Sequence, residues 1–167
     1  MNYKLTSILL FFVAALPSTA QESLSQLLNK HNTKSVPYIS VQELAMPKTE
    51  ALILDTREWQ EYQVSHIKNA LHVGYTHFNL EETTKQLKDK QQQIVVYCSL
   101  GIRSEKIAQQ LKDAGYTNIF NLYGGIFEWK NNNFPVYNLE KKETENVHTF
   151  SKAWSKWLLK GNKIFND

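Results

Sequence analysis

Short apolar runs recur along the middle of the chain and predict strands. The runs at residues 51–54 and 94–97 are unbroken, as in strands that a parallel sheet buries on both faces. Residues 119–122 also predict a strand. A similar run at residues 70–73 predicts a further strand. Residues 36–39 predict a brief edge strand, because Pro37 has no amide hydrogen to donate within a sheet.

Segments with apolar residues at helical spacing lie between these runs. The expected helices cover residues 23–30, 41–46, 59–64, 80–89, 103–115 and the stretch after Gly124-Gly125 that contains Phe127 and Trp129. For the second of these, Ser40 is the expected N-cap, with Glu43 at the capping-box position. Strands that alternate with helices indicate a parallel sheet covered by helices on both faces. In such sheets, functional side chains collect at the carboxyl ends of the strands.

The pattern changes after Asn131. Residues 140–145 form a charged run, and four large apolar residues follow at helical spacing with lysines between them. These apolar residues are Phe150, Trp154, Trp157 and Leu158. They predict a basic amphipathic helix, which we expect to pack back on the domain. Contact of this tail with an anionic membrane surface is the less favoured alternative.

Composition narrows the function classes. The chain has 167 residues, of which 42% are hydrophobic, and this suits one compact domain. Its net charge is only +3, which argues against nucleic-acid binding. Seventeen of the basic residues are lysine and two are arginine, Arg57 and Arg103. In such a lysine-rich chain, we expect arginine where a planar guanidinium with several donors is needed.

The N-terminal segment, residues 1–20, resembles a secretory signal. Lys4 supplies a positive start, an apolar run of nine residues follows, and Ser18-Thr19-Ala20 offers small residues for cleavage. That run is too short to span a bilayer comfortably. We therefore expect an exported protein, periplasmic or secreted, whose mature chain begins near Gln21.

Cys98 is the only cysteine, and it lies where a predicted strand turns into a predicted helix. In an exported protein an unpaired cysteine suggests a reactive thiol. Backbone N–H groups at a helix N-terminus stabilise an anion, so this position and the charge of Arg103 should lower the pKa of Cys98. Gly101 can adopt the backbone angles of a tight turn. The histidines show no metal-ligand spacing, and neither a metal nor another cofactor is expected.

Three motifs in order resemble the rhodanese family of single-domain sulfurtransferases. The first is Leu54-Asp55-Thr56-Arg57-Glu58, continuing through Glu61-Tyr62 to His66-Ile67-Lys68-Asn69-Ala70. The second is the loop Cys98-Ser99-Leu100-Gly101-Ile102-Arg103-Ser104, and the third is Leu122-Tyr123-Gly124-Gly125-Ile126-Phe127-Glu128-Trp129. The resemblance spans about residues 38–129, with Ser65 in place of the family's usual glycine.

This resemblance implies an α/β fold with three layers, in which a mainly parallel five-stranded sheet has helices on both faces. The expected divisions are an N-terminal helical extension at 21–35, the rhodanese domain at 36–137 and the tail at 138–167. The implied reaction moves sulfur from a donor such as thiosulfate to a thiol or cyanide, or to a protein acceptor, through a persulfide on Cys98.

Supporting roles also follow from the resemblance. Residues Ser99 to Ser104 would hold the persulfide with their N–H groups, and Arg103 would face the donor or bond the loop's carbonyls. Asp55 and Arg57 are expected to brace the loop as an ion pair. His66 is expected to be structural.

Loop length separates the alternatives. Related phosphatases and arsenate reductases place arginine six positions after the cysteine, whereas Arg103 is five positions after Cys98 and Ser104 is the sixth. The shorter loop suits one extra sulfur atom better than a phosphate. A rhodanese-like binding module or redox sensor, with an exposed Cys98 open to peroxide, remains the non-enzymatic alternative.

Overall fold

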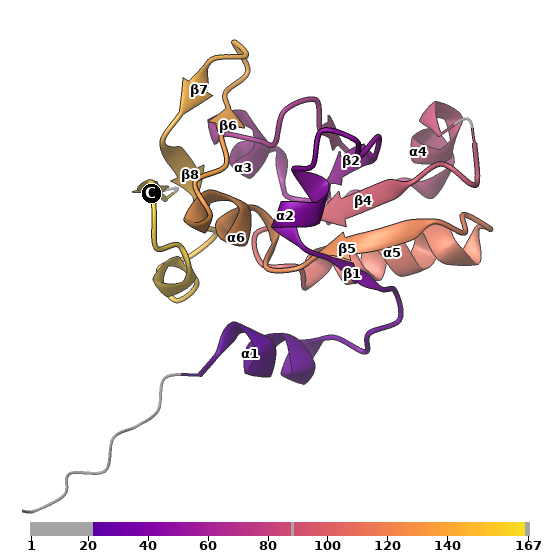
Figure 1. Cartoon of the computed structure of the whole chain (residues 1–167), viewed down its shortest axis with the longest axis horizontal. Coiled ribbons are helices and arrows are strands. Elements are labelled where there is room, and N and C mark those ends of the chain that lie inside the picture. The colour runs from indigo at the N-terminus through magenta and orange to yellow at the C-terminus, as the bar shows by residue number, and fades with distance from the viewer. Residues whose placement is uncertain (1–21, 88, 166–167) are drawn as a thin grey trace, which may run out of the picture.

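The computed structural model describes residues 22–87 and 89–165, so the predicted signal segment at 1–20 lies outside the described residues. Five parallel strands form the main sheet in the order β1-β5-β4-β2-β3 (Figure 1). These strands are β1 Tyr38–Ile39, β2 Leu52–Asp55, β3 Leu71–His72, β4 Ile94–Tyr97 and β5 Ile119–Leu122. The α-helices are α1 Leu24–His31, α2 Val41–Leu44, α3 Trp59–Val64, α4 Leu80–Gln86, α5 Arg103–Asp113 and α6 Gly125–Asn131. This confirms the predicted α/β fold with a five-stranded parallel sheet.

The central strand β4 shows how the sheet divides two hydrophobic layers. Because successive side chains of a strand point to opposite faces, Val95 and Tyr97 join one core cluster while Ile94 and Val96 join the other. Residues of α2 and α6 complete the first cluster, and α5 completes the second. All four strand residues are fully buried, as an unbroken apolar run predicts.

Several local predictions are confirmed at the level of hydrogen bonds. Strand β1 lies at an edge of the sheet, directly after Pro37. Ser40 and Glu43 form the predicted capping box of α2. Helix α4 ends at Gln86, three residues before the predicted end.

The helix predicted in the tail is wrong. Strand β8 (Asn146–His148) pairs in parallel with β9 (Asn162–Ile164), and only one 3₁₀ turn, η1 (Ser155–Trp157), lies between them. The side chain of Asn131 donates to the Trp157 carbonyl at 2.9 Å and accepts from the Leu159 amide at 2.7 Å. The Asn131 side chain thus pairs the Trp157 carbonyl and the Leu159 N–H, which a continuing helix would have paired within its own backbone.

The tail nevertheless packs on the domain. Val147 and Leu158 are fully buried in the first core cluster, and Trp154 and Trp157 pack against it. A second small pairing, β6 (Val136–Tyr137) with β7 (Glu143–Thr144), leads the chain into the tail. The apolar spacing that predicted a helix therefore marks residues that face the core from irregular backbone.

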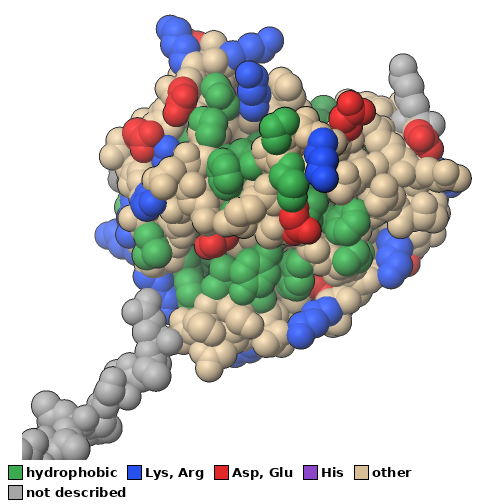
Figure 2. Space-filling model, viewed as in Figure 1, with side chains coloured by type: hydrophobic (Ala, Val, Ile, Leu, Met, Phe, Trp, Pro, Cys, Tyr) green, Lys and Arg blue, Asp and Glu red, His purple; other side chains and the backbone are tan. Residues whose placement is uncertain are grey.

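Charged side chains are dispersed on the face that Figure 2 shows. Lysine and arginine side chains lie mostly towards the edge of this face, and hydrophobic side chains gather nearer its middle, with acidic side chains between them. Within residues 22–87 and 89–165, no helix combines the length and the apolar character that a membrane crossing requires.

Candidate active site

The loop from Cys98 to Ser104 joins the carboxyl end of β4 to the N-terminus of α5. Its amides curve around the Cys98 sulfur, and the Gly101 N–H donates to Sγ at 3.1 Å. The Ser104 hydroxyl lies 3.6 Å from Sγ. Cys98 is 2% exposed, so the exposed thiol assumed for the redox-sensor alternative is wrong.

Opposing effects set the pKa of Cys98. Burial raises it, because it disfavours the charged thiolate. The positive charge of Arg103 lowers it, and so do hydrogen bonds from the backbone and side chain of Ser104 and from the backbone of Leu100. Together these effects outweigh burial, so the pKa of Cys98 is lowered. The sulfur is thus buried and still favoured as an anion, which is what a nucleophilic cysteine requires.

The Gly124-Gly125 turn places α6 against the back of the loop. The Ile126 N–H donates to the Cys98 carbonyl at 3.0 Å, and the Phe127 N–H donates to the Ser99 carbonyl at 3.2 Å. Gly125 has φ +55°, and a Cβ there would overlap the Cys98 carbonyl oxygen. Glycine is therefore needed for this close approach. By taking both carbonyls, α6 leaves the loop's amides to face the sulfur.

Asparagine side chains hold the other side of the loop. Asn121, on β5, donates to the Gly101 carbonyl at 2.8 Å and accepts from the Ser104 hydroxyl at 2.7 Å. Asn32, just after α1, donates to the same Gly101 carbonyl at 2.8 Å. Gly101 itself has φ +97°, the backbone conformation that its sequence position predicted.

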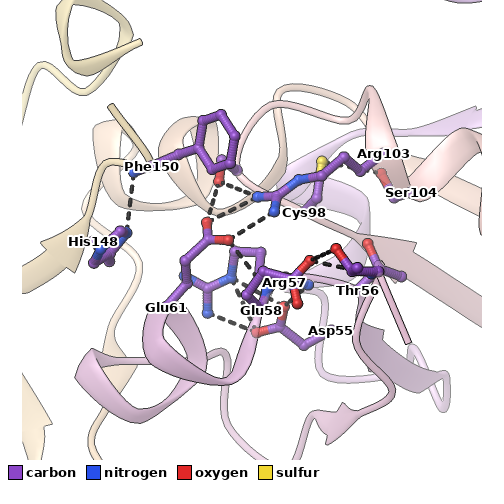
Figure 3. A network of polar contacts seen from close by, with 12 residues as sticks. Asp55, Thr56, Arg57, Glu58, Glu61, Cys98, Arg103, Ser104, His148 and Phe150 are labelled. Carbon is purple, nitrogen blue, oxygen red and sulfur yellow. Dashed lines mark hydrogen bonds and ion pairs between the residues drawn. The ribbon is translucent and has the colours of Figure 1, made fainter. Parts of the chain in front are cut away.

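Arg103 is held by a carboxylate from a neighbouring helix (Figure 3). Its two terminal nitrogens contact the Glu61 carboxylate at 2.7 and 2.8 Å, and Nη2 also donates to the Ser99 hydroxyl at 3.0 Å. Ser99 in turn donates to Glu61 at 2.9 Å. Arg103 was expected to face the donor or to bond loop carbonyls, but its partners are side chains. The ion pair fixes the loop through Ser99.

Asp55 and Arg57 form the expected ion pair, fully buried, with a closest contact of 2.6 Å. Their further contacts are with residues outside the cysteine loop. Asp55 accepts from the Tyr97 hydroxyl at 2.5 Å, and Arg57 donates to the Ser65 carbonyl at 2.6 Å. No hydrogen bond joins either side chain to residues 98–104. Ser65 has φ −168°, an extended conformation that needs no glycine.

His66 lies away from the Cys98 pocket. Its Nδ1 is 3.2 Å from the Tyr62 carbonyl, and its ring stacks on the Tyr62 ring at 4.2 Å. Burial lowers its pKa, which favours the neutral ring. Its backbone forms a bridge with Tyr137. These contacts suit a structural residue.

A pocket of about 310 Å³ opens over the sulfur. The tail supplies part of its wall, because Phe150 and Trp154 line it together with loop residues. The Phe150 ring lies over the Arg103 guanidinium, 4.7 Å from its central carbon (Figure 3). Phe150 has φ +63°, a strained conformation for a bulky residue, and its amide donates to His148 Nδ1 at 3.0 Å. That hydrogen bond helps to hold the ring above Arg103.

Sequence reasoning missed Glu61, Asn121 and the two tail aromatics as site residues. Glu61 belongs to the first motif but was given no role. Asn121 interrupts an apolar strand run, and a polar residue there was a usable signal, because it must find partners when buried. Nothing local placed Phe150 or Trp154 near Cys98. In the described part of the chain, no group of three or more potential metal ligands lies together.

Comparison with known proteins shows which family the central part of the chain belongs to. A family model described as "Rhodanese-like domain" matches residues 40–132. The thiosulfate sulfurtransferase GlpE of Coxiella burnetii is 34% identical over 97 residues, which cover 58% of this chain and 87% of that protein. A tRNA uridine(34) hydroxylase of Onion yellows phytoplasma is 36% identical over 99 residues, 55% of this chain. That match spans only 32% of the hydroxylase, about a third of its length.

Solved structures agree on the fold. A rhodanese-related protein of Thermoplasma volcanium has a TM-score of 0.53 at 27% identity, covering 60% of this chain and 97% of that one. A thiosulfate sulfurtransferase of Pseudomonas aeruginosa has a TM-score of 0.55 at 23% identity, covering 74% of this chain and 23% of that one. At this identity the second comparison concerns the fold alone.

Proposed function

Because this chain belongs to the rhodanese-like domain family, we propose that it is a sulfurtransferase that carries sulfane sulfur as a persulfide on Cys98. The donor is a compound such as thiosulfate, and the acceptor is cyanide, a small thiol or a protein thiol. Neither a cofactor nor nucleic acid takes part. The supporting observation is a buried Cys98 whose pKa is lowered by the charges and hydrogen bonds of its own loop.

The reaction has two displacement steps. The Cys98 thiolate attacks the outer sulfur of thiosulfate, a new S–S bond forms, and sulfite leaves with the electron pair of the broken S–S bond. The anionic acceptor, cyanide or a thiolate, then attacks the outer sulfur of the persulfide and releases the Cys98 thiolate. No external oxidant or reductant is needed. A covalent intermediate divides one difficult transfer into two easier steps.

The loop supports this chemistry better than phosphate chemistry. In a persulfide the outer sulfur carries the charge, and amides that face the Cys98 sulfur are placed to stabilise it. Glu61 pairs with Arg103 and offsets its charge, which lowers the attraction of the loop for a doubly charged phosphate group. Sulfur transfer is therefore the function that this geometry favours.

An intact-mass measurement tests the proposal. Purified protein incubated with thiosulfate should gain the mass of one sulfur atom, and subsequent cyanide should remove it with release of thiocyanate. Cys98→Ser should gain nothing. If the wild-type protein gains no sulfur, or if Cys98→Ser gains as much, the proposed function is wrong.

A parallel reaction with peroxide addresses the redox-sensor alternative. Oxidation of Cys98 much faster than persulfide formation would favour the redox sensor.

We also propose that the protein is exported and that cleavage leaves a mature chain beginning near Gln21. The support is the sequence of residues 1–20 alone. Expression of the full chain in a bacterial host, followed by fractionation and N-terminal sequencing, tests this. Full-length protein recovered from the cytoplasm would contradict it.

A further inference from the structure

The wall of the Cys98 pocket is mostly apolar. Five apolar or aromatic side chains surround the opening: Tyr75, Leu100, Ile102, Phe150 and Trp154. Two of the five, Phe150 and Trp154, come from the tail, outside the region matched by the family model. The pocket of about 310 Å³ is in the range that holds a small organic molecule. Thiosulfate alone would leave much of this wall in contact with water.

The charges at the pocket do not match a doubly charged donor. Arg103 is already paired with Glu61, which is 2% exposed, and the Phe150 ring covers its guanidinium. The Glu61 carboxylate offsets the charge of Arg103, so a doubly charged donor gains less attraction from this guanidinium than from an unpaired one. Lys106 is the other cation on the wall, is exposed, and makes no ion pair with a described residue. One positive charge that no carboxylate offsets suits a donor with one negative charge.

We propose that Phe150 and Trp154 make this pocket select an organic sulfane-sulfur donor with an apolar carrier group and a single negative charge, such as a thiosulfonate or an organic persulfide. The inference rests on the proposed sulfur transfer through Cys98. The carrier contacts the two tail aromatics, the charged end lies near Lys106, and the outer sulfur meets the loop's amides.

The first step is balanced for such a donor. The Cys98 thiolate attacks the outer sulfur of a thiosulfonate, R–SO₂–S⁻, and a new S–S bond forms. The donor's S–S bond breaks, and the sulfinate R–SO₂⁻ leaves with the electron pair. One negative charge enters with the donor and one leaves with the sulfinate. The same attack on an organic persulfide releases the carrier thiolate.

The test compares benzenethiosulfonate with thiosulfate as donors to the full mature chain. For each donor, kcat/KM for persulfide formation is divided by the rate constant of the same donor with free cysteine, which removes intrinsic reactivity. We expect the corrected ratio of benzenethiosulfonate to thiosulfate to be well above one. Methanethiosulfonate, with a smaller carrier, should lie between them, because each methylene in an apolar pocket contributes roughly tenfold.

Two substitutions locate the selectivity. Phe150→Ala and Trp154→Ala should each lower the corrected ratio roughly tenfold, since each removes a large part of the apolar wall. Leu159→Ala is the matched control, because Leu159 belongs to the same tail, is 77% exposed and lies outside this pocket. Its ratio should equal that of the wild type. Thermal unfolding of each variant shows whether it is folded, and Phe150, at 50% exposure, is the milder of the two truncations.

The outcomes separate this inference from the proposed function. Persulfide formation from thiosulfate with a corrected ratio near one overturns the selectivity and leaves sulfur transfer in place. A high ratio that both substitutions leave unchanged in folded protein also overturns the role of the tail. Failure to form a persulfide with any donor overturns both proposals.

Discussion

At the scale of single residues, the reactivity of Cys98 depends on charges and hydrogen bonds that its neighbours supply. Burial by itself would raise the pKa of Cys98, and Arg103 is the main group that opposes it. Glu61, in a buried position, balances the charge of Arg103 and helps to hold it at the site. The ion pair therefore holds a positive charge near the sulfur, while the Glu61 carboxylate offsets part of its attraction for an anionic donor.

The first prediction concerns the pH dependence of Cys98. A lowered pKa means that the thiolate persists to lower pH, so alkylation by iodoacetamide should rise with pH through a midpoint below that of ordinary cysteine. The double variant Glu61→Gln with Arg103→Met removes both charges and leaves neither unpaired. Its midpoint should move to higher pH, and its alkylation at pH 7 should be roughly tenfold slower.

The control for this prediction neutralises a remote, exposed ion pair in the same way. Glu82→Gln with Lys85→Met removes a pair whose side chains are more than half exposed. Its alkylation profile should coincide with that of the wild type. If the Glu61 and Arg103 variant also keeps the wild-type midpoint, Arg103 does not set the pKa of Cys98.

At the scale of elements, the N-terminus of α6 acts as a support for the cysteine loop. Its first amides take the carbonyls of Cys98 and Ser99, and this direct contact requires glycine at position 125. The Gly-Gly motif, which begins 26 residues after Cys98, is thus part of the same site. Its spacing in the chain gives no hint of which atoms it touches.

The second prediction is that Gly125→Ala disturbs the loop and lowers the free energy of unfolding by about 1–3 kcal/mol or more, because the new Cβ overlaps the Cys98 carbonyl. Gly74→Ala is the matched control. Gly74 also has a positive φ, +70°, but a Cβ there would be 3.7 Å from the nearest atom. Urea unfolding and the rate of persulfide formation measure the two variants. Equal losses in both would mean that backbone strain, and not the overlap, determines the effect.

At the scale of the whole molecule, the tail completes the domain. Residues 146–164 return to the first core cluster, and they also bring Phe150 and Trp154 to the pocket. The same segment thus contributes to stability and to the shape of the site. A tail that only touched a membrane surface would leave Leu158 dispensable for folding.

Adjacent leucines in the tail give the third prediction. Leu158 is fully buried, so Leu158→Ala should lower the free energy of unfolding by about 2–5 kcal/mol. Leu159 is 77% exposed, so Leu159→Ala should change it by less than about 0.5 kcal/mol. Chemical denaturation of both variants makes the comparison. A small loss for Leu158→Ala would show that the tail does not belong to the core.

Sequence reasoning reached the sheet, the order of the helices and the cysteine loop because these depend on local patterns. Apolar runs identify buried strands, Ser40 with Glu43 marks a helix start, and Gly101 marks a tight turn. The tail was misjudged because helical spacing of apolar residues also occurs in irregular backbone whose polar groups are paired elsewhere. Here Asn131 supplies those pairings from a distant element.

The sequence by itself determined the fold class, the candidate nucleophile and the loop length, because each depends on patterns of residues close together in the chain. Only the tertiary structure decided that Glu61 forms an ion pair with Arg103 and that α6 and Asn121 hold the loop by hydrogen bonds. It also decided that the aromatic residues of the tail form part of the pocket wall. These contacts join residues far apart in the chain. A local pattern can show that a residue is buried, but it does not specify which distant residues it meets, and those partners determine how the charges at the site are balanced.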